Sequence, residues 1–448
     1  MKKMFLQDIV KVTKGRLVCG DENLELGSFS INTKTINNDE VFVGIKGEKV
    51  DGSKFYLDAF NNGAIGAIIN KESVDIKEVE GKFILEVDDT VIALQEIAKY
   101  KRSLYEDLLV VGVTGSVGKT STKDIIALTL SNKYKVLKTE GNYNNELGLP
   151  LTILGLKDET ALVLEMGMDG FGQLSTLSKI GRPKYAVITN VGTAHIANLG
   201  SRENILKAKL EILDGLDKDG KLFINNDNDM LNMWNNKEKK SNVVTFGINN
   251  KSDYTATNVS YDELTTFTCN NEEYKVNVGG EAFVYNALSA IAIGTTLGID
   301  KSMIKNSLSN IVLTKNRLQE IDKKGYRIIS DCYNANYDSM KEGLSNLGKY
   351  KDKRKIAVLG DMLELGEYSK NLHEKVGEEV LNNNIDILVT VGTEAKYIAN
   401  IASKSVEVHE FDNNKDAIKY LNEIIKKDDV ILVKASHGMN FTEIVENI

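Results

Sequence analysis

The chain has 448 residues, of which 42% are hydrophobic and 27% charged, a composition typical of a globular protein with roughly three domains. Its net charge of −8 argues against broad nucleic-acid binding, although a local basic pocket for an anionic small molecule remains compatible with it. The three cysteines are far apart, which argues against a disulfide framework, and no apolar run approaches the length of a membrane span.

The N-terminal segment MKKMFLQDIVKVTKG is interrupted by Gln7, Asp8 and Lys11, so it lacks the apolar region of a signal peptide. We therefore expect a cytoplasmic protein. Farther along the first hundred residues, the apolar runs VFVGIK (41–46) and AIGAIIN (64–70) predict two strands with a helix between them.

A second unit begins with the predicted strand LLVVGVT (108–114), which a helix from about 120 to 130 follows. The runs ALVLE (161–165) and YAVITN (185–190) predict two further strands. The segment 217–278 is polar and rich in asparagine, with strand-like stretches such as NVVTFGI (242–248). We expect this segment to form an edge sheet of the same unit.

A third unit contains four apolar runs separated by helical patterns: RIISD (327–331), KIAVLGD (355–361), DILVTVG (386–392) and VILVKAS (430–436). They predict a small parallel sheet, and none carries the G-x-G-x-x-G dinucleotide motif. Alternation of strands and helices along the whole chain predicts an α/β protein. We place its three domains at 1–106, 107–313 and 314–448.

The segment VGVTGSVGKTST (111–122) nearly matches the phosphate-loop pattern G-x-x-x-x-G-K-[ST], but Val113 stands where that pattern has its first glycine. A glycine-rich turn between a strand and a helix presents backbone N–H groups that hold phosphate oxygens. We expect Lys119 to neutralise the phosphates and the Thr120 hydroxyl to bind the accompanying Mg²⁺.

Two further residues lie where strands of this unit end. In an open parallel sheet, ligands bind beyond the carboxyl ends of the strands. Glu165 ends one strand and is either a metal ligand or a helix-capping or surface carboxylate. His195 follows Thr189-Asn190 after a short loop and is either a ligand to a second metal ion or a hydrogen-bonded loop histidine.

The segment SRENILKAKLEILDGL (201–216) predicts one helix with Ser201 as N-cap. Lys209 falls near the middle of its apolar face, whereas Lys207 and Asp214 lie opposite. A buried ammonium is costly unless it is paired or chemically changed. Lys209 therefore either extends its amine to the edge of the apolar face or carries an N-carboxylate (carbamate) that faces a metal.

The segment GNYNNELGLPLTIL (141–154) places Asn142, Asn144 and Asn145 in one loop before an apolar stretch. Asparagine suits turns because its side chain bonds to nearby backbone, which accounts for one or two of the three. Three asparagines beside Glu146 indicate a binding loop rich in neutral donors and acceptors.

Together these motifs resemble those of the Mur ligase family. The middle unit carries GVTGSVGKTST, GNYNNELGLPLT, and EMGMDGFGQLSTLSKIGRPKYAVITNVGTAH with KAKLEI after it. The third unit carries DCYNANYDSM (331–340), IAVLGDMLELGEYSKNLHEKVG (356–377) and LVKASHGM (432–439). The first unit carries VFVGIKGEKVDGSKF (41–55). The resemblance implies a small N-terminal α/β uridine-nucleotide domain, a central P-loop ATPase domain with a parallel sheet, and a C-terminal Rossmann-like domain.

The resemblance implies an ATP-dependent, ADP-forming amide ligase that uses Mg²⁺ and works through an acyl phosphate. GNYNNE and LGDMLELGE favour the member that adds D-Ala-D-Ala to a UDP-muramoyl-tripeptide in peptidoglycan precursor synthesis. The Asp-Asn-Pro-Arg run usual in the relative that adds a diamino acid does not occur. We expect a monomer with no nucleic-acid partner.

The resemblance also implies roles for individual residues. Lys119, His195 and Lys209 would be catalytic, with Lys209 at the position of the family's carbamylated lysine. Thr120, Glu165 and His195 would hold magnesium. ATP would be bound by Gly115, Ser116, Val117, Gly118, Lys119, Thr120, Ser121, Asn286, Arg317 and Asp331. The UDP-peptide substrate would be bound by Thr33, Lys34, Lys46, Gly47, Asn142, Asn144, Asn145 and Glu146.

Three positions depart from the family pattern. Ala282-Phe283 replaces a His-Asn pair expected near the adenine, and Asn32-Thr33-Lys34 replaces Asp-Ser-Arg in the first unit. His437 replaces an arginine near the expected dipeptide carboxylate, a change that is not conservative for carboxylate recognition.

Because of these departures, two alternatives stay open: a divergent paralogue with another second substrate, and a nucleotide-binding regulator without ligase activity. A related ligase such as a folylpolyglutamate-type enzyme is a further alternative, against which the first unit and GNYNNE argue.

Overall fold

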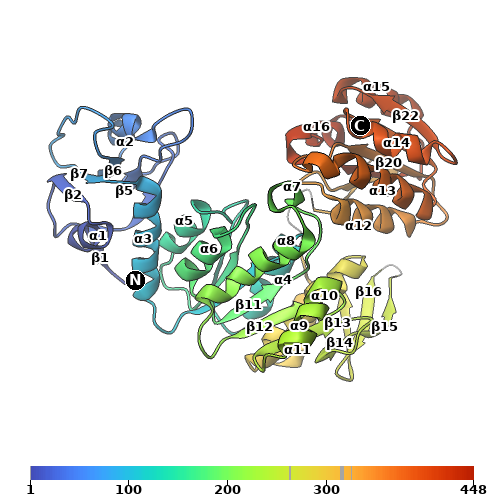
Figure 1. Ribbon diagram of the computed structural model, residues 1–448, viewed down its shortest axis with the longest axis horizontal. Helices are drawn as coiled ribbons and strands as arrows, with labels where there is room; N and C mark the ends of the chain where they lie inside the picture. Colours follow the sequence, from blue (N-terminus) through green and yellow to red (C-terminus); the bar gives the residue numbers. More distant parts are fainter. Residues whose placement is uncertain (1, 262–263, 313–316, 324) are drawn as a thin grey trace.

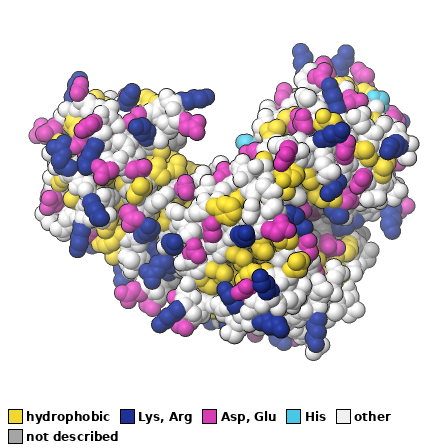
Figure 2. All heavy atoms as spheres, viewed as in Figure 1, with side chains coloured by type: hydrophobic (Ala, Val, Ile, Leu, Met, Phe, Trp, Pro, Cys, Tyr) yellow, Lys and Arg dark blue, Asp and Glu magenta, His cyan; other side chains and the backbone are white. Residues whose placement is uncertain are grey.

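The computed structural model describes residues 2–261, 264–312, 317–323 and 325–448. Its three α/β domains follow one another along the chain, with the N-terminal and C-terminal domains standing on either side of the central domain (Figure 1). The face shown in Figure 2 is hollowed between these two outer domains. No helix among the described residues is long and apolar enough to cross a membrane.

The N-terminal domain contains a five-stranded sheet of order β2-β7-β6-β5-β4, in which only β2 runs antiparallel to its neighbour. The strands predicted at 41–46 and 64–70 are confirmed as β5 and β6, whereas β2, β4 and β7 were not predicted. The elements are β1 (Met4–Phe5), α1 (Leu6–Thr13), β2 (Arg16–Cys19), β3 (Glu25–Leu26), β4 (Ser28–Ser30), β5 (Glu40–Val43), η1 (Gly52–Phe55), α2 (Tyr56–Asn61), β6 (Gly66–Asn70), β7 (Phe83–Val87) and α3 (Thr90–Ser103).

The central domain is built on a seven-stranded parallel sheet of order β14-β13-β12-β11-β8-β10-β9, so β8 lies in its interior. Its elements up to the end of this sheet are β8 (Leu109–Thr114), α4 (Lys119–Leu130), β9 (Val136–Lys138), α5 (Gly148–Leu154), β10 (Ala161–Glu165), α6 (Gln173–Gly181), β11 (Tyr185–Ile188), α7 (Ile196–Leu199), α8 (Arg202–Leu210), η2 (Glu211–Gly215), β12 (Lys221–Asn225), α9 (Asp229–Glu238), β13 (Val243–Gly247) and β14 (Tyr254–Thr255).

The prediction of a separate edge sheet over 217–278 is wrong in part. Strands β12, β13 and β14 extend the main parallel sheet, and α9 interrupts the segment. Only the last part forms a small antiparallel sheet, which short polar strands favour because one of its faces meets water. The remaining elements are β15 (Thr257–Ser260), β16 (Thr265–Cys269), β17 (Glu272–Val276), α10 (Glu281–Thr296) and α11 (Lys301–Ser309).

The C-terminal domain has a six-stranded sheet of order β18-β19-β23-β20-β21-β22, in which β18 alone is antiparallel. The four predicted strands are confirmed as β19, β20, β21 and β23, whereas β18 and β22 were missed. The elements are β18 (Gln319–Lys323), β19 (Tyr326–Ser330), α12 (Tyr337–Gly348), β20 (Lys355–Gly360), η3 (Gly366–Tyr368), α13 (Ser369–Asn382), β21 (Ile387–Val391), α14 (Lys396–Ala402), β22 (Glu407–Phe411), α15 (Asn414–Ile424), β23 (Val430–Lys434), η4 (His437–Met439) and α16 (Thr442–Asn447).

Both faces of the central sheet are covered, which is why its strands are continuous apolar runs. Along β8, Val110 packs into one buried cluster with Leu164, and the next residue Val111 packs into another with Ile126 and Leu288. Helices α4 and α10 cover the second face. This packing fixes the carboxyl end of β8, where the glycine-rich loop begins.

The first domain boundary, between 106 and 107, falls between α3 and β8. The second, between 313 and 314, lies outside the described residues.

Candidate active site

The glycine-rich loop joins β8 to α4. Gly115 has a φ of 155° and Gly118 a φ of 81°, conformations that L side chains rarely adopt. A Cβ atom at Gly115 would also lie 1.8 Å from the Thr189 hydroxyl oxygen. The loop therefore needs glycine at 115 for both space and backbone geometry.

Asn190, just after β11, holds the first half of this loop. Its Oδ1 accepts hydrogen bonds from the N–H groups of Ser116 (3.0 Å) and Val117 (2.9 Å). The backbone N–H groups at the start of α4 are different. Those of residues 118–121 donate no hydrogen bond to any acceptor among the described residues. Unsatisfied N–H groups at a helix N-terminus are suited to binding an anion such as phosphate.

Lys119 is the first residue of α4, and its ammonium donates a hydrogen bond of 2.7 Å to the carbonyl oxygen of Gly115. Burial lowers the pKa of Lys119, while the nearby Glu165 carboxylate acts in the opposite direction. The Lys119 amine thus contacts the glycine-rich loop whose bound phosphates it is predicted to neutralise.

Glu165 ends β10 and is 2% exposed. Its Oε1 accepts a hydrogen bond of 2.7 Å from Nδ2 of Asn144, whereas its Oε2 is buried with no hydrogen-bond partner among the described residues. Glu165 caps no helix and is not on the surface. A buried carboxylate oxygen without a donor is suited to a cation.

His195 precedes α7 and has a left-handed backbone, with a φ of 62°. Its Nδ1 lies 3.5 Å from a carboxylate oxygen of Glu364 in the C-terminal domain and makes no hydrogen bond within the described chain. Burial, together with Lys119 and Lys209, lowers the pKa of His195 to about 4. The imidazole is thus neutral near pH 7, which is the form that binds metals.

Lys209 is 1% exposed on α8. The Ser201 cap is confirmed, but the predicted single helix is wrong at its end: α8 stops at Leu210 and tightens into the 3₁₀ helix η2. No hydrogen bond or ion pair joins the Lys209 side chain to any part of the chain that the structure describes. Burial, and then the Lys119 charge, lowers the pKa of Lys209 well below its usual value.

Arg317 of the C-terminal side reaches the phosphate loop. Its Nη2 donates a hydrogen bond of 3.2 Å to Oγ1 of Thr120, and its guanidinium carbon lies 3.7 Å from the centre of the Tyr333 ring. Arg317 thus stacks on its own domain while it contacts the central one.

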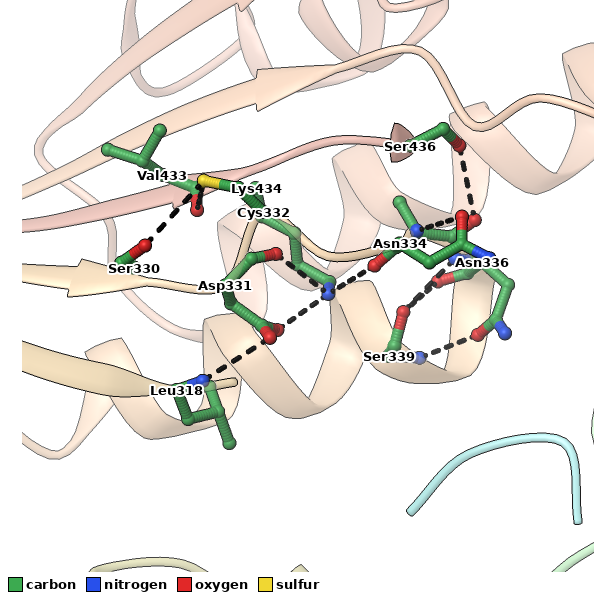
Figure 3. A network of polar contacts seen from close by, with 11 residues as sticks. Leu318, Ser330, Asp331, Cys332, Asn334, Asn336, Ser339, Val433, Lys434 and Ser436 are labelled. Carbon is green, nitrogen blue, oxygen red and sulfur yellow. Dashed lines mark hydrogen bonds and ion pairs between the residues drawn. The ribbon is translucent and has the colours of Figure 1, made fainter. Parts of the chain in front are cut away.

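Asp331 is held in a polar network at the end of β19 (Figure 3). Its Oδ2 accepts a hydrogen bond of 2.6 Å from the buried ammonium of Lys434, and its Oδ1 accepts one of 3.3 Å from the Leu318 N–H. Lys434 also donates to the carbonyl oxygen of Asn334 (3.0 Å). Asp331 and Lys434 thereby fix the turn that follows Asp331.

Asn286 lies on α10, beneath the phosphate loop. Its Oδ1 accepts a hydrogen bond of 2.9 Å from the Thr122 hydroxyl. A Cβ atom at Gly118 would lie 3.4 Å from the same oxygen. Asn286 is therefore close enough to fix the start of α4.

A cavity of about 510 Å³ lies between the central and C-terminal domains. The predicted residues that line it are Ser116, Val117, Gly118, Lys119, Thr120, Asn144, Asn145, Glu146, Glu165, His195 and Arg317. Two smaller cavities adjoin it. One is lined by Ser121, Phe283, Asn286 and Asp331, and the other, of about 180 Å³, by Lys119, His195, Glu364 and His437.

Other predicted residues are not brought to these cavities. Asn142 is exposed, and Lys209 lies behind the cavity wall. Thr33, Lys34, Lys46 and Gly47 are at the surface of the N-terminal domain, where Lys46 pairs with Asp51 in an isolated β-bridge.

Several C-terminal residues that line the main cavity were not predicted from the sequence: Tyr333, Asn334, Asn336 and Ser339. All lie in DCYNANYDSM, directly after the carboxyl end of β19, where the rule applied to Glu165 would have found them. Within the described residues, no group of three or more His, Cys, Asp or Glu side chains is arranged so that it could hold a metal ion.

Two family models match the chain: the Mur ligase middle domain over residues 113–294 and the Mur ligase, glutamate ligase domain, over 316–437. A UDP-N-acetylmuramoyl-tripeptide–D-alanyl-D-alanine ligase of Bacillus subtilis (strain 168) is 38% identical over 100% of this chain and 99% of the relative. The ligase of the same name from Escherichia coli (strain K12) is 32% identical over 99% of this chain and 98% of the relative.

Solved structures similar to this chain come from ligases of the same family. A crystal structure of MurF from Acinetobacter baumannii has a TM-score of 0.91 at 28% identity and covers 100% of this chain and 98% of that one. MurF from Thermotoga maritima, solved in complex with ADP, has a TM-score of 0.81 at 32% identity and covers 94% of this chain and 96% of that one.

Proposed function

The chain belongs to the Mur ligase family, and from that premise we propose that it is an ATP-dependent ligase that adds D-alanyl-D-alanine to a UDP-N-acetylmuramoyl-tripeptide. The reaction forms an amide bond and belongs to peptidoglycan precursor synthesis, which we place in the cytoplasm. The observation that carries the proposal is the cavity in which the phosphate loop faces C-terminal residues of DCYNANYDSM.

The chemistry proceeds in two steps. The tripeptide carboxylate attacks the γ-phosphoryl group of ATP, which yields an acyl phosphate and ADP. The dipeptide amine then attacks the acyl carbon, and the tetrahedral intermediate expels phosphate as the amide forms. Such a reaction asks the protein mainly to position the reactants and to neutralise charge.

We assign the ATP phosphates to the N-terminus of α4, where the free N–H groups of 118–121 meet the Lys119 ammonium. Arg317 faces the same loop from the C-terminal domain, and Asn286 and Asp331 line the smaller neighbouring cavity. Phe283 also lines that cavity, so an apolar ring replaces the polar contact expected near the adenine.

We assign one Mg²⁺ to Thr120 and Glu165 and a second Mg²⁺ to His195. The buried, unpartnered Oε2 of Glu165 and the unpartnered Nδ1 of His195 fit this role. Magnesium usually takes one or two protein ligands, with waters and substrate phosphates completing its shell, so the lack of a larger acidic cluster in the described chain is compatible with it. When bound, the ion would neutralise charge on the phosphoryl group being transferred.

We further propose that Lys209 is carbamylated. A lysine amine reacts with CO₂ only when it is neutral, and burial near Lys119 holds the pKa of Lys209 well below its usual value. Carbamylation would place a negative charge on this buried side chain, where it would offset the nearby charge of Lys119. The uncompensated burial of Lys209 supports this assignment.

For the UDP-peptide substrate we propose Thr33, Lys34, Lys46 and Gly47 of the N-terminal domain, with the loop from Asn142 to Glu146. Gln95 of α3 donates a hydrogen bond of 3.4 Å to the carbonyl oxygen of Glu146, so the N-terminal domain contacts this loop directly. We retain 1–106, 107–313 and 314–448 as the domain limits.

The test supplies the purified protein with ATP, Mg²⁺, a UDP-muramoyl-tripeptide and D-Ala-D-Ala, and follows phosphate release. Release that depends on both the tripeptide and the dipeptide is the expected result. Release that needs the tripeptide but another amine would indicate a divergent paralogue, and ATP binding without turnover would indicate a regulator.

A further inference from the structure

The segment 189–195, between β11 and α7, connects the phosphate loop to the C-terminal domain. On its inner side, the Thr189 hydroxyl donates a hydrogen bond of 2.6 Å to the Val117 carbonyl, and the Gly192 N–H donates one of 2.9 Å to the Ser116 hydroxyl. With the two bonds accepted by Asn190, these contacts tie the segment to the phosphate loop.

On its outer side, Thr193 of the same segment contacts the Asp338 carboxylate of the C-terminal domain. Oδ2 of Asp338 accepts hydrogen bonds from the Thr193 N–H (2.7 Å) and the Thr193 hydroxyl (3.0 Å). Asp338 lies in the first turn of α12, where the helix dipole favours a negative charge, and Asn336 caps that turn. The carboxylate is thus held rigidly on its own domain.

Gly192 shows how closely the two domains meet at this point. A Cβ atom on Gly192 would lie 2.2 Å from Oδ2 of Asp338. The φ of Gly192 is not in the left-handed region, so an alanine there would meet no backbone strain. The three heavy atoms nearest to such a Cβ all belong to the Asp338 carboxylate group.

We propose that Asp338 is a positioning residue that couples docking of the C-terminal domain to the shape of the phosphate loop. Its two bonds to Thr193 fix segment 189–195, and that segment fixes Ser116 and Val117. The proposal rests on the proposed ligase function only for its kinetic consequence, because nucleotide binding and domain docking are measurable without turnover.

The experiment compares the full-length wild type with Asp338→Ala, Asp338→Asn, Thr193→Val, Gly192→Ala and the double variant Gly192→Ala/Asp338→Ala. Gly27→Ala is the matched control, because a Cβ atom there meets nothing within 4 Å. Three quantities are measured with Mg²⁺ present: affinity for ADP, radius of gyration by small-angle scattering, and kcat/KM for ATP in phosphate release.

Since hydrogen bonds to a charged acceptor are strong, we expect Asp338→Ala and Gly192→Ala each to lower kcat/KM for ATP roughly 10- to 100-fold. ADP affinity should fall in parallel and the radius of gyration should increase. Asp338→Asn retains a hydrogen-bond acceptor for Thr193, so its kcat/KM and ADP affinity should fall less than those of Asp338→Ala. The double variant should be no worse than Asp338→Ala, because the alanine at 192 then has no carboxylate to displace.

The proposal would be overturned if the losses in kcat/KM of the two single variants multiplied in the double variant. It would also be overturned if the single variants lost thermal stability while their ADP affinity and radius of gyration stayed unchanged. If the wild type shows no dipeptide-dependent phosphate release, the ligase proposal fails. ADP affinity and size then decide the role of Asp338 by themselves.

Discussion

Asn144 donates a hydrogen bond of 2.7 Å to one oxygen of the Glu165 carboxylate, and the other oxygen of that carboxylate has no partner among the described residues. The asparagine loop therefore orients a group that the adjoining strand supplies. One oxygen is fixed by the protein, and the other is left for a cation.

This geometry predicts the effect of removing the charge. Glu165→Gln should raise the Mg²⁺ concentration needed for half-maximal phosphate release about 10- to 100-fold. Asn144→Ala should raise it about 10-fold, because a side chain that hydrogen-bonds to a metal ligand also affects the affinity for the metal. A magnesium titration of initial rates is the measurement. Glu140→Gln, an exposed neighbour, is the control. An unchanged requirement in Glu165→Gln would remove this residue from the metal site.

Lys209→Ala should lose at least about 100-fold in turnover, since it removes a buried group of α8 whose charge state is coupled to Lys119. Short carboxylic acids should restore part of the rate by supplying the missing anion, whereas bicarbonate alone should not. The matched control is Lys207→Ala on the exposed face of the same helix. A carbamate signal after ¹³C-bicarbonate labelling is expected in the wild type only, and full activity of Lys209→Ala would end the carbamate proposal.

Arg317→Lys should weaken ADP binding about 5- to 30-fold. Lysine keeps the charge but loses both the planar stack on Tyr333 and the guanidinium hydrogen bond to Thr120. Calorimetric titration with ADP measures the change. Tyr333→Phe keeps the ring and should bind normally, while Tyr333→Leu should resemble Arg317→Lys. Equal affinities in all three variants would contradict the stacking role.

Glu342 predicts a pH dependence of stability. Burial, and then the nearby Asp331, raises the pKa of this carboxyl to about 7, above its value in an unfolded chain. At low pH the Glu342 carboxyl is protonated in both the folded and the unfolded chain, so it has little effect on stability. As pH rises from about 4.5 to 7, the unfolded chain loses this proton first, and the free energy of unfolding falls.

Glu342→Gln should therefore raise the free energy of unfolding at pH 8 by roughly 1–3 kcal/mol, with little effect at pH 4.5. Urea unfolding at several pH values is the measurement. A variant that is less stable than the wild type at pH 8 would contradict this assignment.

His437→Arg should lower the KM for D-Ala-D-Ala about tenfold, because a guanidinium can hold a carboxylate through two hydrogen bonds. His437 lines the small cavity that also contains Lys119 and His195, which is where we expect the second substrate. Initial rates at varied dipeptide concentration measure the effect, and the KM for ATP serves as the internal control.

Strand positions could be predicted well wherever both faces of a sheet are covered, as along β8, β10 and β20, because burial on both sides leaves a continuous apolar run. Strands β18 and β22 were missed because both are edge strands in which charged residues interrupt the apolar run. The helix through Lys209 was predicted too long, since apolar periodicity does not distinguish α8 from the tighter η2.

Site residues at the carboxyl ends of strands could be predicted from type and position, as for Lys119, Glu165 and His195. Residues that act across the domain gap could not. The pairing of Asp338 with Thr193, 145 residues apart, follows from how two domains dock, which no local pattern records. Similarly, the stack of Arg317 on Tyr333 depends on the turn that Lys434 fixes.

The interior position of β8 has a consequence for how the molecule opens. With β11 on one side and β10 on the other, β8 opens only when the whole central sheet separates. Its amides should be among the last in the protein to exchange with deuterated solvent. The anion-binding turn at its end would then persist through local openings of the outer domains, and nucleotide would protect even partly opened molecules from proteolysis.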